Sequence, residues 1–155
     1  MQLIQIEKMP LPSEDPVNRP SHYLAASVSI EPIELTSRLD SCLGQAVQYV
    51  LRAPFKGNER EDLQKAAFYL SRRIELLKYS TTNLPVFFSG ETAGFIAAFQ
   101  KAENLSVAQN FIYELFSPQD KAGFASTVQH AMKALKVIRD RLEELDLIDK
   151  ARAAE

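Results

Sequence analysis

The sequence predicts an all-α protein: a helical bundle with an extended, proline-rich N-terminal arm and a C-terminal helical extension that ends in a long helix. Apolar residues recur at three- and four-residue steps in several segments, which is the spacing of one face of an α-helix. Half of the eight prolines stand at positions 10, 12, 16 and 20, so the start of the chain is expected to be extended. The 155 residues are 46% hydrophobic, which is enough for a buried core.

These features divide the chain into three parts. We expect an extended arm at 1–25, a helical core at 26–78 and a helical extension at 79–155 that could serve oligomerisation. Within the arm, residues 1–12 carry a short apolar alternation that fits either an edge strand or a loose segment.

Composition argues against several classes of protein. The formal net charge of -2 and the pI near 5.8 argue against duplex nucleic acid as the main partner, because that affinity depends on neutralising phosphates. The single Cys42 excludes an intramolecular disulfide and a zinc site built from several cysteines, and we interpret it as a small buried apolar residue. No apolar run approaches a length of about 18 residues and the start does not resemble a secretion signal, so we expect an intracellular protein without a membrane span.

Two helices are expected after the arm. Pro32 suits the first turn of a short helix that ends near Asp40. Ser41 is expected to cap the second helix, whose apolar stripe runs from Leu43 to Leu51 until Pro54 stops it.

A third helix has the clearest start signal. Gly57 and Asn58 supply a turn and a cap, Glu61 stands three residues after Asn58 as in a capping box, and one apolar stripe continues to Leu77. Because the connection at 52–58 is short, the second and third helices are expected to form an antiparallel hairpin.

The second half is expected to continue as helices. Residues 78–83 suit a linker, and Pro85–Phe88 suits an apolar loop or a short strand. The apolar spacing over 93–116 predicts two helices, the second starting near Asn104 or Ser106.

A long final helix is expected to start at Ser117–Asp120, which combines a cap, a proline and an acid. It should run to about residue 146 and be followed by a frayed tail at 149–155. Its apolar residues approximate a coiled-coil seam that could pack on the other helices or on a second subunit: Val128, Met132, Leu135, Ile138, Leu142 and Leu145.

The glycines exclude the standard phosphate-binding loops, since neither a P-loop nor a dinucleotide-binding glycine pattern occurs. The segment 52–58 suggests a different phosphate site, because Arg52 and Lys56 bracket the turn that leads into the third helix. Two cations beside the free amides of a helix start can hold an anion. The alternative is that Arg52 serves the carbonyl end of the second helix and Lys56 is solvated.

His22 and Tyr23 are further candidates. An imidazole can accept a proton or bind a phosphate, and a tyrosine ring can stack on a nucleobase. The alternative is structural: His22 pins the arm to the helices, and Tyr23 anchors a core. His130, within the final helix, is expected to pack or to face solvent.

The acids at the start of the third helix do not predict a metal site. A metal-binding patch needs carboxylates that face one another across two helices, and the second helix offers Gln45 and Gln48 instead. We interpret Glu61 as a cap residue, and Glu59 and Asp62 as charges that favour a helix start.

Three blocks of residues stand out along the first half of the chain. They are Asp15-Pro16-Val17-Asn18-Arg19-Pro20-Ser21-His22-Tyr23, then Gly44 to Ala53, and Lys56-Gly57-Asn58 with Glu61 to Leu70. These blocks resemble the small phage and prophage family catalogued as domain of unknown function 3310. The resemblance covers roughly residues 14–77, with the blocks in the family's order and spacing. The chain departs from the family at Arg19, Gln45 and Pro54, where histidine, asparagine and glycine are usual.

The family includes a phage nucleotide kinase that lacks a P-loop and transfers a phosphoryl group to deoxynucleoside monophosphates. The resemblance therefore implies nucleotide binding and the kinase reaction, in the cytoplasm of a bacterial host, with a nucleoside mono- and triphosphate as partners. Whether Mg²⁺ accompanies the nucleotide is left open, and no metal-binding residue is assigned. On this hypothesis the catalytic residues are His22 and Arg52, and the nucleotide-binding residues are Asp15, Asn18, Arg19, Tyr23, Tyr49, Lys56, Gly57 and Asn58.

Two other functions fit the same sequence. One is a sensor or sponge that binds a nucleotide without turning it over. The other is a helical protein that binds and modulates a host protein through residues 79–155. The apolar seam of the final helix also predicts a homo-oligomer.

Overall fold

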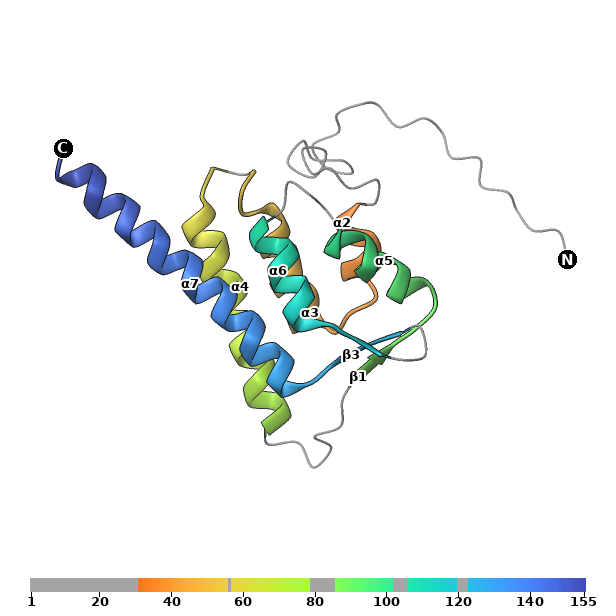
Figure 1. Cartoon of the computed structure of the whole chain (residues 1–155). Coiled ribbons are helices and arrows are strands. Elements are labelled where there is room, and N and C mark those ends of the chain that lie inside the picture. The colour runs from red at the N-terminus through yellow and green to blue at the C-terminus, as the bar shows by residue number, and fades with distance from the viewer. Residues whose placement is uncertain (1–30, 56, 79–85, 102–105, 120–122) are drawn as a thin grey trace, which may run out of the picture.

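The computed structural model describes residues 31–55, 57–78, 86–101, 106–119 and 123–155 (Figure 1). The predicted arm, with the segment from Asp15 to Tyr23, lies outside this part of the chain. The described elements are α2 (Pro32–Thr36), α3 (Ser41–Arg52), α4 (Glu59–Lys78), β1 (Val86–Phe88), α5 (Glu91–Gln100), α6 (Ser106–Leu115), β2 (Ser117–Gln119), β3 (Gly123–Ser126) and α7 (Val128–Ala153).

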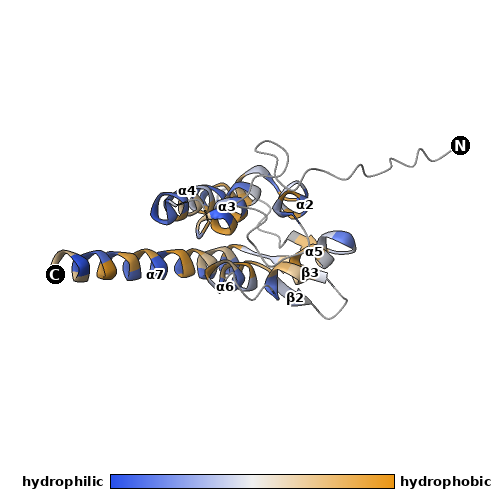
Figure 2. Cartoon of the chain, turned by 90° about the horizontal axis from the view of Figure 1, so that it is seen from above, coloured by the Kyte–Doolittle hydropathy of each residue, from blue (hydrophilic) through white to orange (hydrophobic). Residues whose placement is uncertain are grey.

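The helices form two layers. Figure 2 shows α2, α3 and α4 in one layer, with α6 and α7 in the other. Contacts between α4 and α7, and between α3 and α6, join the layers. The largest fully buried side chains of the resulting core come from both halves of the chain: Leu35, Leu43, Leu63, Leu70, Ile96, Phe99, Phe111, Ile112, Leu115, Phe116 and Ile138.

The predicted hairpin of α3 and α4 is confirmed in its main features. Asp40, rather than Ser41, caps α3, because its carboxylate Oδ1 accepts a hydrogen bond from the Leu43 amide at 2.9 Å. The turn after α3 reaches α4 through Gly57, whose φ of 81° is strained for other residues. Asn58 caps α4, because its Oδ1 accepts a hydrogen bond from the Glu61 amide at 3.4 Å, and its Nδ2 donates a second hydrogen bond to Glu61 Oε2 at 2.6 Å.

A small antiparallel sheet corrects the all-α prediction. Its strand order is β1-β3-β2, so the short-strand alternative for Pro85–Phe88 is confirmed at Val86–Phe88. The predicted helix start at Ser117 is wrong: Ser117 pairs with Ala125, and Pro118 with Phe124. Pro118 is tolerated because β2 is an edge strand. Proline has no amide donor, and an edge strand needs hydrogen bonds to a neighbouring strand on one side only.

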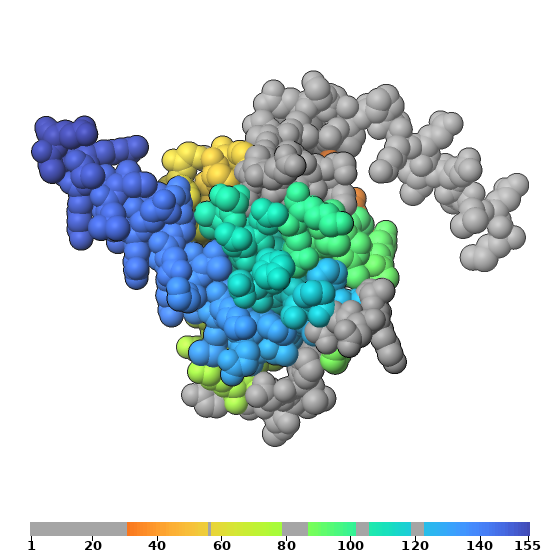
Figure 3. All heavy atoms as spheres, in the orientation of Figure 1, coloured from red at the N-terminus to blue at the C-terminus, as the bar shows by residue number. Residues whose placement is uncertain are grey.

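The final helix starts later and ends later than its sequence predicts. α7 begins at Val128 and continues to Ala153, beyond the expected fraying point, and its end projects past the rest of the described chain (Figure 3). Ion pairs from Arg60 on α4 to Asp146 and Asp149 hold part of this last stretch.

The predicted seam of α7 packs mainly within the chain. Leu135 and Ile138 are buried, and α7 contacts both α4 and α6. Met132 was assigned to the seam, but it is exposed. Of the helices in the ranges given above, none combines the length and apolar character needed to cross a membrane.

The start of α7 gives a pH-dependent prediction. Thr127 Oγ1 accepts a hydrogen bond from the His130 amide at 3.2 Å, and the Thr127 amide donates to His130 Nδ1 at 3.1 Å. Burial and the nearby Lys133 lower the pKa of His130, while Glu114 acts in the opposite direction. The folded state therefore disfavours the protonated ring. The contribution of neutral His130 to folding stability is complete above about pH 6.5, the ordinary pKa, and is lost as the pH falls below that value.

We therefore expect a His130→Gln variant to lose less stability than the wild type between about pH 7 and about pH 5. The glutamine can still accept the Thr127 hydrogen bond, yet it does not titrate, and His22 is present in both proteins. The difference should be a fraction of about 1 kcal/mol, which is typical of one helix cap. Urea unfolding at the two pH values measures it, and equal losses in both proteins would contradict the assignment.

Candidate functional site

The structure describes four of the ten predicted site residues. Tyr49 and Arg52 lie at the end of α3, and Gly57 and Asn58 lie in the turn before α4. The proximity of the arm to this turn, on which the predicted site depends, stays a prediction. The other six residues lie outside the described ranges: Asp15, Asn18, Arg19, His22, Tyr23 and Lys56.

Arg52 is held by an ion pair across the hairpin. Its Nη2 lies 2.8 Å from Asp62 Oδ1 and its Nε lies 3.2 Å from Oδ2, so the pair has two contacts. Asp62 is only 3% exposed, which makes it a buried counter-ion rather than only a charge at a helix start. The ion pair orients the Arg52 guanidinium. The Asp62 carboxylate also offsets part of the positive charge that Arg52 would present to a phosphate.

An aromatic cluster begins at one side of this ion pair. The Arg52 guanidinium carbon lies 4.4 Å from the centre of the Tyr49 ring, and Lys65 Nζ lies 5.7 Å from it. Tyr49 also stacks on Tyr69, with ring centres 5.9 Å apart and ring planes at 10°. Phe68 and Tyr69 form a T-shaped pair, with ring centres 5.3 Å apart, and Phe68 is 64% exposed. Since Arg52 already lies over Tyr49, Phe68 is the better platform for a planar ligand ring.

These side chains line an open hollow of about 390 Å³, which we call the Tyr49–Phe68 hollow. Lys65 is a partly exposed cation of this hollow and pairs with Glu61, and their hydrogen bond raises the pKa of Lys65 and lowers that of Glu61. Both groups therefore stay charged over the physiological pH range. The lining residues are Tyr49, Glu61, Gln64, Lys65, Phe68 and Tyr69.

Sequence reasoning missed the part of the hollow that α4 contributes. Lys65 and Phe68 are three residues apart and lie outside the apolar stripe that contains Leu63 and Leu70, so they share the solvent face. An exposed phenylalanine beside a lysine on that face is the signal that could have revealed them. In the described part of the chain, no group of three His, Cys, Asp or Glu side chains is placed to hold a metal ion.

Residues 17–71 match a family of proteins of unknown function, DUF3310, so the chain contains a DUF3310 domain over this range. The domain includes α2, α3 and α4 as far as residue 71, and every residue that lines the Tyr49–Phe68 hollow lies within it. A comparison with curated proteins and another with solved structures found no match.

Proposed function

We propose that the protein binds a nucleotide at the Tyr49–Phe68 hollow. The observation that carries this proposal is an exposed aromatic ring, Phe68, one helical turn from a partly exposed cation, Lys65, in an open hollow. Stacking on an aromatic face is a common way to hold a nucleobase, and a lysine beside it can meet a phosphate. The hollow also adjoins Arg52 and the start of α4, where the family resemblance expects a phosphate.

On this proposal the protein is a phage-type nucleotide kinase without a P-loop, which transfers phosphate from a triphosphate to a deoxynucleoside monophosphate. Phosphoryl transfer depends mainly on positioning the reacting groups and on neutralising their negative charge, so cationic side chains are expected to contribute most to catalysis. The ion pair with Asp62 fixes the orientation of Arg52 beside the turn. His22 would act at the transferred group or at the acceptor oxygen.

Replacing Phe68 by alanine tests the site with little risk to the fold, because the ring is mostly exposed. We expect the affinity for deoxynucleoside mono- and triphosphates to fall about tenfold, the value typical of one lost stacking contact. Phe87→Ala is a matched control, since Phe87 is 67% exposed and lies on β1, outside the hollow. Isothermal titration calorimetry measures both, and equal affinities in the two variants would overturn the proposed site.

Turnover separates a kinase from a sponge. A mixture of deoxynucleoside mono- and triphosphates, incubated with the full chain and resolved by chromatography, should yield diphosphates if the protein is a kinase. Nucleotide binding without diphosphate would instead support a sensor or sponge at the same hollow.

A further inference from the structure

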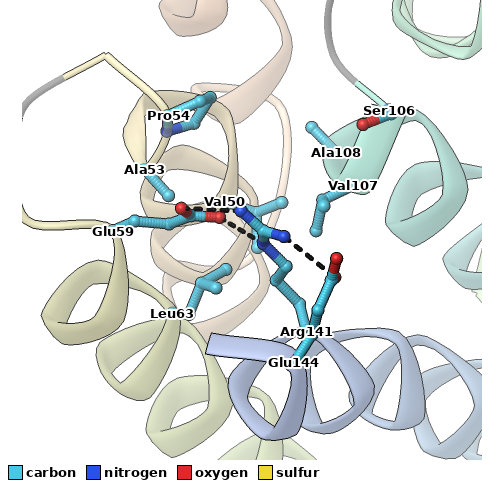
Figure 4. Close-up of a pocket in the computed structure, with 10 residues that line it drawn as sticks. All are labelled: Val50, Ala53, Pro54, Glu59, Leu63, Ser106, Val107, Ala108, Arg141 and Glu144. Atoms are coloured by element: carbon cyan, nitrogen blue, oxygen red, sulfur yellow. Dashed lines mark hydrogen bonds and ion pairs between the residues drawn. The ribbon is translucent and has the colours of Figure 1, made fainter. Parts of the chain in front are cut away.

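A second cavity of about 460 Å³ lies where the DUF3310 domain meets the C-terminal half (Figure 4). It is separate from the Tyr49–Phe68 hollow, because α4 contributes Glu59 and Leu63 here and Glu61 and Lys65 there. Val50 and Leu63 come from the hairpin, and Val107 comes from the start of α6. The cavity therefore has apolar walls from both halves of the chain, and its size is in the usual range for small-molecule sites.

The polar part of the wall is a cluster of three charged residues centred on Arg141. Its Nε and Nη2 lie 2.7 and 3.1 Å from the two carboxylate oxygens of Glu59. Its Nη1 lies 2.8 Å from Glu144 Oε2. Figure 4 shows the guanidinium between the two carboxylates, which come from α4 and α7.

The cluster has a surplus of negative charge. Two carboxylates meet one guanidinium, and hydrogen bonds to Glu59 and Glu144 raise the pKa of Arg141 above its ordinary value. Each carboxylate can accept about four hydrogen bonds. Most of the further hydrogen bonds that the cluster can form are therefore ones in which a carboxylate oxygen accepts from a ligand. Glu144 is the more exposed acid and can turn a carboxylate oxygen to an incoming group, whereas Glu59 and Arg141 are partly buried.

From this combination we propose that the cavity binds a small ligand with one protonated amine on a compact apolar body. The ammonium group would donate to Glu144 and neutralise the surplus charge, and the apolar body would lie against Val50, Leu63 and Val107. An ammonium fits the acceptor surplus better than a carboxylate, which would add a third negative charge to the wall.

Three probes of one shape test this chemistry on the full chain: cyclohexylamine, cyclohexanol and cyclohexanecarboxylate. In titrations followed by amide chemical shifts, the amine should bind about tenfold more tightly than the alcohol, and the carboxylate should bind least. The chemical-shift changes should be largest at Val50, Leu63 and Val107. The affinity for the amine should fall at high salt, because salt screens the attraction between the charges. Binding of the alcohol as tightly as the amine, tighter binding of the carboxylate, or no binding of the amine would each overturn the proposal.

A pair of neighbouring variants tests the role of Glu144. Glu144→Gln should reduce the affinity for cyclohexylamine about fivefold, because it removes the exposed negative charge and keeps the shape. Glu143→Gln is the control, since Glu143 is also exposed on α7 but does not line the cavity. Equal affinities in the two variants would overturn the assignment, and neither substitution is expected to change nucleotide binding at the Tyr49–Phe68 hollow.

Discussion

A chain truncated after Lys78 is expected to lose the cooperative unfolding transition of the full-length protein, although it retains the whole DUF3310 range. α4 packs on α7, and its buried residues include Leu63, Leu70 and Ile74. Truncation would expose this apolar face to water, and the remaining hairpin is too small to bury an equivalent area. The described part of the DUF3310 domain therefore shares its core with the C-terminal half, and we expect it to need that half to stay folded.

Thermal melting followed by circular dichroism measures this effect, and binding of a hydrophobic dye reports the exposed face. A chain truncated after Lys150 is the matched control, because residues 151–155 are all exposed and should be dispensable. A sharp melting transition in the shorter chain would contradict the expected dependence. If the expectation holds, nucleotide binding has to be tested in the full chain, since truncation would remove the site together with the second half.

The helices of the hairpin were predictable because their signals are local. Apolar spacing, the Asn58 cap and the Pro54 stop all act within a few residues, and they place α3 and α4 nearly where the structure has them. The strand at Val86–Phe88 was one of two alternatives, but the other two strands and their pairing were not predictable in this way. Ser117 and Pro118 carry a genuine helix-start pattern, but pairing with β3 competes with it, and that pairing depends on a turn and on packing against the core.

The candidate site shows the same division. Tyr49 and Arg52 were identified from a turn and a family resemblance, both of which can be seen in the sequence. The contact between Arg52 and Asp62 joins two helices, so its existence depends on how the hairpin is registered. Glu59 likewise gains its partner Arg141 from α7, far away in the chain, and no local pattern of charges indicates such a pair.

Arg52→Ala is expected to lower the free energy of unfolding by about 3 kcal/mol, because removing one partner of a buried ion pair leaves the other charge unpaired. A role for Arg52 in phosphate binding alone would predict a loss of binding with little loss of stability. The structure changes that expectation, since Asp62 is 3% exposed and its carboxylate would be left buried without the Arg52 guanidinium.

Urea unfolding measures the loss, with Arg72→Ala as the control. Arg72 is an exposed arginine on α4 that pairs with Glu75, and such surface pairs contribute little. The double variant Arg52→Ala with Asp62→Ala should recover part of the stability, because no buried charge is then left without its partner. A loss for Arg52→Ala as small as that for Arg72→Ala would show that the pair is not important for the fold. If the large loss is observed, Arg52→Lys becomes the informative variant for phosphate binding, since it keeps a positive charge beside Asp62 while removing the two-contact geometry.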